Sequence, residues 1–496
     1  MAPIRTETEF DRTQAALSPQ GLTLPLPRGD IGITVADGVE ATPTGQRLLA
    51  LLVNVLARMK GVVDTVHINT TADPFVLPGT PLSPGHLNDG LATFVRSLNW
   101  IGSRHDAELS FEPPDDAVVQ IGIGTNPGSA DLVVACDAWR ALLGAAGDQA
   151  SWETANPIGA ALAAVVTAAE TFKAIIAGNG GRNTTPAPPD FIYSAFNYGV
   201  DDSAEIGPDV YKLELQDVAI AGCGAGGSGT AFILGMHPRL SGTIDLIEPG
   251  IHKVSNINRY LPALAGDVHT PRHKLSSIAD HLARTAPALD LALHPRPWEQ
   301  LDRHPWSTVV SAVDTVEARW QIQQRTRSDA VIIDLAVNDL LYSVLRVVPG
   351  GRCLFCKHPF DPDLAVNQRA LRWGVPLVTI KEWSSANRPV DEAMIRSLAH
   401  TQNRPPEDFD DLLGILFTNT PALLECGSTS LRADVPSQAP ILPLATTAVA
   451  IVGAAEVIKH VIGLPPLDNW LAHDLRRNPT GPWSTYRAPI QDCPHH

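Results

Sequence analysis

The amino-acid sequence predicts an α/β protein with two Rossmann-like domains, the first degenerate and the second complete, and a helical region inserted into the second. Two observations favour this fold class. Residues 217–259, DVAIAGCGAGGSGTAFILGMHPRLSGTIDLIEPGIHKVSNINR, are typical of a strand, a glycine-rich turn, a helix and a second strand that ends on an acid. Two Ala-rich apolar helices, predicted over 156–178 and 445–463, share an AAExxK pattern, one in each half of the chain.

Length and charge limit the classes of function. The chain has 496 residues, too many for one ordinary core, so we expect about two to four domains. Its formal net charge of −16 argues against nucleic acid or an anionic membrane as the main partner, because both surfaces are negative. The segment MAPIRTETEFDR lacks the basic and apolar pattern of a signal peptide, and charged residues or Pro interrupt the longest apolar stretches. We therefore expect a soluble, cytoplasmic protein.

The glycine-rich turn predicts a nucleotide site. Its glycines follow the pattern GxGGxG, at Gly224, Gly226, Gly227 and Gly229, and Glu248 closes the next strand. Glycine lets the backbone approach a phosphate at a helix N-terminus, and an acid at this distance reaches ribose hydroxyls. A nicotinamide-dependent oxidoreductase would carry the same fingerprint, so the residues that follow must distinguish the two classes.

The residues after this acid favour a nucleoside triphosphate. VSNINR supplies Asn256 and Arg259 just beyond the acid, and Arg suits a bidentate hold on phosphate oxygens. Arg272 and Lys274 lie near the start of the next predicted helix. Asp314 follows an apolar strand, where a carboxylate that faces a phosphate-binding turn is a natural magnesium ligand.

The order of these motifs resembles the adenylation domain of ubiquitin-activating enzymes and of the bacterial sulfur-carrier adenylyltransferases. The resemblance covers about residues 213–496. It implies that the glycines and polar residues named above bind ATP, that Asp314 holds Mg²⁺, and that Arg259 and Lys274 act catalytically on the phosphates. Two positions depart from the family pattern: Gly250 replaces a second acid and Thr315 replaces an Asn, and both departures concern the metal shell.

The cysteines predict a structural metal site. Cys353 and Cys356 form a CxxC pair, which by itself could be a redox pair or half of a metal site. The chain ends on CPHH, where the resembled family has a second CxxC. Three thiolates and one imidazole suit tetrahedral zinc, with Cys353, Cys356, Cys493 and His496 as ligands and His495 as the alternative fourth ligand.

An insertion at 357–440 separates the two parts of the second domain, 213–356 and 441–496. Ubiquitin-type activating enzymes place a catalytic cysteine there, and Cys426 is the cysteine of this region. We expect its thiolate to accept an acyl group as a thioester, the alternative being a buried helix-end cysteine. Cys136 and Cys223 lie within or just after apolar strands and are expected to be buried.

The first half, about residues 1–180, echoes the second. Besides the AAExxK helices, residues 131–144 parallel 307–320, and residues 181–212 act as linker and lead-in. The glycine turn has decayed and no SNxNR follows. By resemblance, this half is the inactive partner in an internal pseudo-dimer, and Arg12 in the EFDR segment is the arginine that reaches the ATP phosphates of the active half.

The resemblance implies a two-step activity. ATP adenylates the C-terminus of a ubiquitin-like protein, and Cys426 then takes the acyl group for transfer to a conjugating enzyme. Two alternatives stay open: an adenylyltransferase for a sulfur carrier or peptide that forms no enzyme thioester, and a non-catalytic scaffold that binds a ubiquitin-like protein. A composition rich in Ala, Pro and Arg suggests a bacterial source, with antiviral defence as a setting by resemblance.

Overall fold

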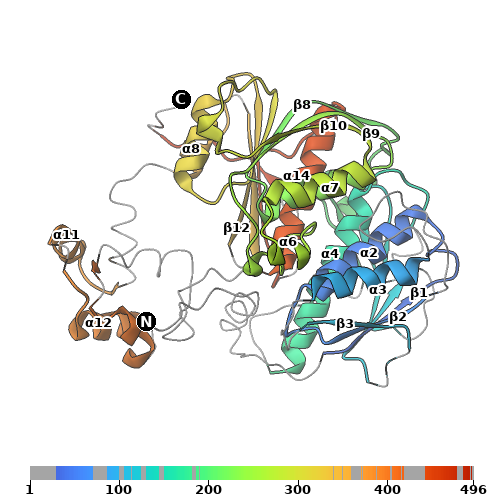
Figure 1. Ribbon diagram of the computed structural model, residues 1–496, viewed down its shortest axis with the longest axis horizontal. Helices are drawn as coiled ribbons and strands as arrows, with labels where there is room; N and C mark the ends of the chain where they lie inside the picture. Colours follow the sequence, from blue (N-terminus) through green and yellow to red (C-terminus); the bar gives the residue numbers. More distant parts are fainter. Residues whose placement is uncertain are drawn as a thin grey trace.

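The computed structural model describes residues 29–70, 86–99, 106–180, 186–358, 370–417 and 442–493, apart from short gaps at 113, 115, 125–129, 145–149, 189, 339, 349, 371–372, 387, 403–404, 415, 478–483 and 492. Within these residues the predicted fold class is confirmed. The chain forms two mixed, mostly parallel sheets, one in each half, with helices packed between them (Figure 1).

The first sheet has the order β3-β2-β1-β4-β5-β6-β7. Its strands are β1 (Ile31–Val35), β2 (Thr65–Asn69), β3 (Glu108–Ser110), β4 (Val119–Ile123), β5 (Leu132–Cys136), β6 (Arg140–Leu143) and β7 (Phe191–Ser194). The strands from β3 to β5 run parallel, and β6 and β7 are antiparallel to their neighbours. Helices α2 (Pro43–Ala57) and α3 (Leu87–Leu98) provide the crossovers β1–β2 and β2–β3.

The second sheet repeats this plan in the order β10-β9-β8-β11-β12-β13-β14-β15. Its strands are β8 (Leu213–Ala221), β9 (Leu240–Ile247), β10 (Ala288–His294), β11 (Thr308–Ser311), β12 (Val331–Asn338), β13 (Leu341–Val347), β14 (Trp470–Asp474) and β15 (Ser484–Thr485). The strands from β10 to β12 are parallel, and the remaining pairs are antiparallel. The two halves therefore share one Rossmann-like strand order.

One sequence match between the halves is wrong. Residues 131–144 form β5 and β6, whereas 307–320 form β11 and helix α8 (Val316–Arg325). By its place in the sheet, β5 corresponds to β12, and the counterpart of β11 is β4. Central parallel strands are buried on both faces and are mostly apolar, so their sequences do not reveal their order. The AAExxK match is correct, because α4 (Ile158–Gly178) and α14 (Pro443–Val461) occupy equivalent positions in the two halves.

Four helices form the layers between the sheets. Helix α4 packs on α2 and on α14, which lie near it in Figure 1, and α5 (Ala225–Gly235) packs on α14. One hydrophobic core runs through both halves. Helices α4 and α14 are long and apolar enough to cross a membrane by composition, yet 89% of each apolar window is buried inside the protein. A helix that is apolar all round is here a core helix.

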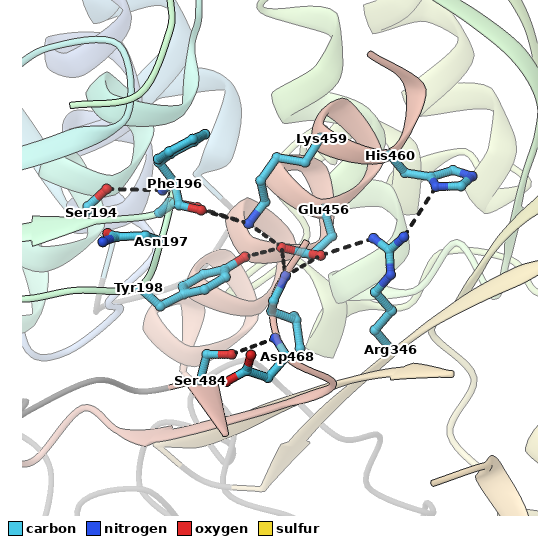
Figure 2. Close-up of polar contacts among 12 residues, drawn as sticks. Ser194, Phe196, Asn197, Tyr198, Arg346, Glu456, Lys459, His460, Asp468 and Ser484 are labelled. Carbon is cyan, nitrogen blue, oxygen red and sulfur yellow. Dashed lines mark hydrogen bonds and ion pairs between the residues drawn. The ribbon is translucent and has the colours of Figure 1, made fainter. Parts of the chain in front are cut away.

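A buried polar network ties the two halves together (Figure 2). Glu456 on α14 accepts a hydrogen bond from Tyr198 Oη at 2.6 Å and pairs with Arg346 at 3.3 Å. Lys459, one turn further on, pairs with Glu456 and donates to the carbonyls of Ala195 and Phe196 at 3.3 and 3.1 Å. The second AAExxK motif thus bonds to the segment that follows β7 of the first half.

The insertion forms a small helical unit with its own core. It contains α11 (Leu377–Ser385), α12 (Glu392–Gln402) and the 3₁₀ helix η6 (Pro406–Leu412), and in Figure 1 it stands apart from the sheets. Trp373 and Phe417, both fully buried, centre this separate cluster with their rings 5.2 Å apart. Cys426 lies outside the described residues.

Candidate functional site

The glycine turn lies between β8 and α5, and its glycines differ in what they do. Gly222 has a φ of +86°, which only glycine adopts without strain, and Gly224 is the N-cap of α5 without any side-chain cap. A Cβ at Gly227 would clash with the Gly222 carbonyl, and one at Gly229 would lie 2.7 Å from Ala450 Cβ on α14. Gly224 and Gly226 therefore border the open helix end, whereas Gly227 and Gly229 allow close packing. The first-turn N–H groups of α5 can receive an anion.

Glu248 follows β9 and is nearly buried. Its Oε1 accepts from the Gly250 backbone N–H at 2.9 Å and from Lys274 Nζ at 3.2 Å. Lys274 is the first residue of α7 (Lys274–Thr285). A Cβ at Gly250 would come within 2.6 Å of Glu248 Oε1 and 3.0 Å of Lys274 Nζ. The glycine that replaces an acid at this position therefore makes room for the Glu248–Lys274 pair.

Tyr260 gathers two cations beside the glycine turn. Arg259 Cζ and Lys274 Nζ lie 5.6 and 5.5 Å from its ring centroid, in the range of cation–π contacts. A Cβ at Gly224 would lie 3.4 Å from Tyr260 Oη, so the hydroxyl faces the turn. Tyr260 was not predicted from the sequence as a site residue. An aromatic residue directly after the Arg of SNINR was the available signal.

The pKa values of the two cations in this cluster are shifted by burial and by their neighbours. Burial lowers the pKa of Arg259, while Tyr260 and Asp314 act to raise it. The pKa of Lys274 is raised: burial, the largest influence, acts to lower it, but Tyr260 and Glu248 together outweigh burial. Both groups carry positive charge at neutral pH, and Asp314 lies within electrostatic reach of Arg259. The site thus presents two cations and two carboxylates around an open helix N-terminus.

Asp314 is exposed on the loop that follows β11, and a buried ion-pair network supports that loop. Arg319 donates to the carbonyls of Val313 at 2.7 Å and Leu335 at 3.1 Å, and it pairs with the fully buried Asp334. Lys357 Nζ pairs with the same carboxylate at 2.8 Å. An acid inside the apolar strand VIIDLAV was a sequence signal for this network, because a buried charge needs partners.

Three predicted site residues make other contacts. The buried Arg259 guanidinium donates from Nη1 to the carbonyl of Ser255 and to Asn258 Oδ1. Asn256 Oδ1 accepts from the Lys253 backbone N–H at 2.9 Å and so shapes the 3₁₀ turn η4 (Val254–Asn256). The Arg272 guanidinium is held by Asp267 at 3.0 Å and Asp280 at 2.8 Å. Arg12 lies outside the described residues.

Three buried cysteines form a candidate metal site. Cys353 Sγ lies 3.6 Å from the sulfur atoms of both Cys356 and Cys493, and their ligand atoms all lie within 4.8 Å of one another. Such spacing fits three corners of a tetrahedral zinc site, and the all-thiolate set suits that metal. The backbone N–H of Ile490 donates to Cys356 Sγ at 3.5 Å, and hydrogen bonds of this kind orient the ligands of metal sites. His495 and His496 lie outside the described residues. Cys136 and Cys223 are fully buried, as predicted.

Comparison with known proteins gives two family matches. The ThiF family model matches residues 201–494, and the BilD N-terminal domain model matches residues 30–185. An uncharacterised protein named y4jF from Sinorhizobium fredii is 23% identical over 450 residues, which are 88% of this chain and 82% of that protein.

Among solved structures, the crystal structure of E. coli MccB is 14% identical over 57% of this chain and 65% of its own, with a TM-score of 0.38. The crystal structure of PaaA is 17% identical over 53% of this chain and 70% of its own, with a TM-score of 0.32. The chain thus spans roughly two thirds of the length of these proteins. At these scores the likeness says nothing about the site.

Proposed function

Because the chain belongs to the ThiF family of E1-like adenylating proteins, we propose that it uses ATP to activate the C-terminal carboxylate of a ubiquitin-like protein. One observation carries the proposal: Lys274 and Arg259 share the Tyr260 ring beside the uncapped N-terminus of α5. Two cations at an open helix end suit the phosphates of ATP.

In the proposed reaction, a carboxylate oxygen of the protein substrate attacks the α-phosphorus of ATP. The bond from that phosphorus to the bridging oxygen breaks, pyrophosphate leaves with the bonding electrons, and an acyl-adenylate remains. Glu248 would receive the ribose, and Arg259 and Lys274 would stabilise the charge that develops on the phosphate oxygens. Asp314 is the exposed carboxylate that would hold Mg²⁺, which neutralises phosphate charge when bound.

ATP–pyrophosphate exchange that depends on a ubiquitin-like protein tests this step. We expect Arg259→Ala to lower the exchange rate by about 100-fold, because a preorganised charge at the phosphates is lost. Arg327→Ala is the control, since Arg327 is exposed and pairs with Asp329. Absence of exchange with every genuine partner would favour the scaffold alternative.

A second step would follow at Cys426. Its thiolate would attack the acyl carbonyl, AMP would leave, and the resulting thioester would pass to the cysteine of a conjugating enzyme. We expect a reductant-sensitive adduct in the wild type and in Cys136→Ala, and none in Cys426→Ala. Exchange without any such adduct would instead identify an adenylyltransferase for a sulfur carrier or a peptide.

The first half bears on the biological system in which this activity would occur. Its match to the BilD N-terminal domain favours a bacterial ubiquitin-like conjugation system, in which this half pairs with the active half as the inactive member. Zinc at Cys353, Cys356 and Cys493 would fasten the C-terminal segment to the end of β13, a structural role. Adenylation of a purified ubiquitin-like protein from the same genome tests the assignment of the partner.

A further inference from the structure

The segment that carries Arg259 and Tyr260 is held by the first half of the chain. Arg58, the C-cap of α2, is fully buried, and its guanidinium crosses from the first half to the second. Its Nη1 donates to the carbonyl of Ile257, and its Nη2 donates to the carbonyls of Leu261 at 2.8 Å and Ala263 at 2.9 Å.

Neighbouring residues orient this guanidinium and extend the contact. Asn54, one turn earlier on α2, accepts from Arg58 Nε at 2.6 Å and donates from Nδ2 to the carbonyl of Leu261 at 3.3 Å. Further along, the backbone N–H of Ala265 donates to the carbonyl of Ser97 on α3 at 2.9 Å. Helices α2 and α3 thus bond to the segment 257–265 along most of its length.

The carbonyls to which Arg58 donates lie on both sides of the two site residues. Ile257 precedes Arg259 and Tyr260, and Leu261 and Ala263 follow them. Ile257, Leu261 and Ala263 are buried, and a buried carbonyl without a hydrogen-bond donor is costly. A guanidinium offers several donors in one plane and can serve several carbonyls at once, which an ammonium cannot match in geometry.

We propose that Arg58 is a positioning residue of the nucleotide site: through its guanidinium, the degenerate half fixes the backbone that places Arg259 and Tyr260 beside the glycine turn. The inference rests on the proposed function for its effect on ATP, whereas its effect on the segment 257–265 stands independently. It gives the first half a role in the chemistry although the site itself belongs to the second half.

Amide hydrogen exchange of the protein without nucleotide tests whether Arg58 holds the backbone of residues 257–265. Arg58→Met is compared with Arg47→Met, which removes another buried guanidinium from the same helix, one that donates to the Thr154 carbonyl within the first half at 3.0 Å. We expect amide exchange in 257–265 to accelerate by about tenfold or more in Arg58→Met and to stay at the wild-type rate in Arg47→Met. Equal acceleration in both variants would overturn the proposal, because it would show general loosening.

Calorimetry of ATP binding, with Mg²⁺ present, tests whether Arg58 acts on the nucleotide site. We expect Arg58→Met to weaken ATP binding by about tenfold, and the double variant Arg58→Met/Arg259→Ala to bind no more weakly than Arg259→Ala alone. Additive losses would contradict positioning through Arg259. If Arg58→Met does not fold, Asn54→Ala keeps the guanidinium and removes its orienting bond, and we expect the same non-additivity with a smaller loss. Failure of the wild type to bind ATP would refute the proposed function and leave the exchange result intact.

Discussion

The two halves differ most where each first strand meets its helix. In the second half, β8 leads through Gly222 into α5, whose N-terminus has no side-chain cap. In the first half, the Thr42 side chain accepts from the Gly45 N–H at 3.0 Å and caps α2, and the preceding loop carries Asp37 and Glu40. A helix end that is capped by its own chain and preceded by acids disfavours a phosphate. The proposed nucleotide site of the second half therefore has an open helix N-terminus, which the first half lacks.

Both halves, by contrast, keep the buried ion pair of the AAExxK helix. Glu170 pairs with Lys173 at 2.5 Å and accepts from the Ala187 N–H at 2.8 Å, and Glu456 pairs with Lys459 and accepts from the Leu467 N–H at 3.2 Å. In each half the acid of AAExxK therefore fastens the loop that leads to an outer antiparallel strand. Among the described residues, Glu456 of the second copy also bonds to Tyr198 and Arg346.

The largest expected effect is a difference in stability between substitutions in the two AAExxK helices. Glu456→Ala leaves Lys459 and Arg346 buried without their carboxylate, which we expect to lower the free energy of unfolding by about 3–5 kcal/mol. Glu170→Ala removes a carboxylate that pairs with one buried cation in place of two, so it should cost less. Urea unfolding of both variants measures the difference, and equal losses would show that the extra contacts of Glu456 add nothing.

Among the described residues, the candidate metal site belongs to the second half alone. We expect Cys353→Ser to lose about one equivalent of zinc by elemental analysis and to lower the free energy of unfolding by about 2–3 kcal/mol. Cys136→Ser, at a buried cysteine of the first half, should keep its zinc. Zinc content unchanged in Cys353→Ser would refute the cysteine site.

The open helix end of the second half can be closed by design. The backbone of Gly224, with φ −70°, accepts an L-residue, and its Cβ would meet only Tyr260 Oη at 3.4 Å. Gly224→Thr should supply the cap that Thr42 supplies to α2, raising the free energy of unfolding by about 0.3 kcal/mol while weakening ATP binding about tenfold.

The matched change in the first half is Thr42→Ala. We expect it to cost about 1 kcal/mol of stability and to leave ATP binding at the wild-type level. An unchanged ATP affinity in Gly224→Thr would mean that the helix end takes no part in binding.

The last comparison concerns how stability depends on pH. Helix α3 buries Leu87, Gly90, Leu91, Phe94, Val95 and Leu98, whereas α7 buries His281. Burial, aided by Arg284, lowers the pKa of His281 from 6.5 to about 3. The unfolded chain gains a proton below about pH 6.5 that the folded chain refuses until about pH 3, so stability falls across this window as pH falls.

We therefore expect His281→Leu to reduce the slope of the unfolding free energy against pH by up to about one proton between pH 6 and pH 4. Phe232→Leu, which removes the ring stacked on His281 at 4.1 Å, keeps the titrating group and should keep the slope. Identical slopes in the wild type and His281→Leu would rule out this histidine as the source.

Much of the candidate site could be predicted from local sequence. GAGGSG, Glu248 and Lys274 meet because β8, α5, β9 and α7 follow a fixed right-handed order, which places strand ends and helix starts at one edge. Tyr260 and Asp334 were not predicted, because their importance comes from neighbours distant in sequence: the aromatic ring from Arg259 and Lys274, and the buried acid from Arg319 and Lys357.

Local patterns in the sequence were enough to predict the fold class, the duplicated helices and the set of chemical groups, because hydrophobic periodicity and residue spacing can be read without the fold. The tertiary structure decided which strands correspond between the halves, which glycines pack and which face the site, and that Arg58 holds the backbone around Arg259. These features depend on contacts between segments about two hundred residues apart, and the chemical type of a residue does not specify which distant carbonyl it will meet.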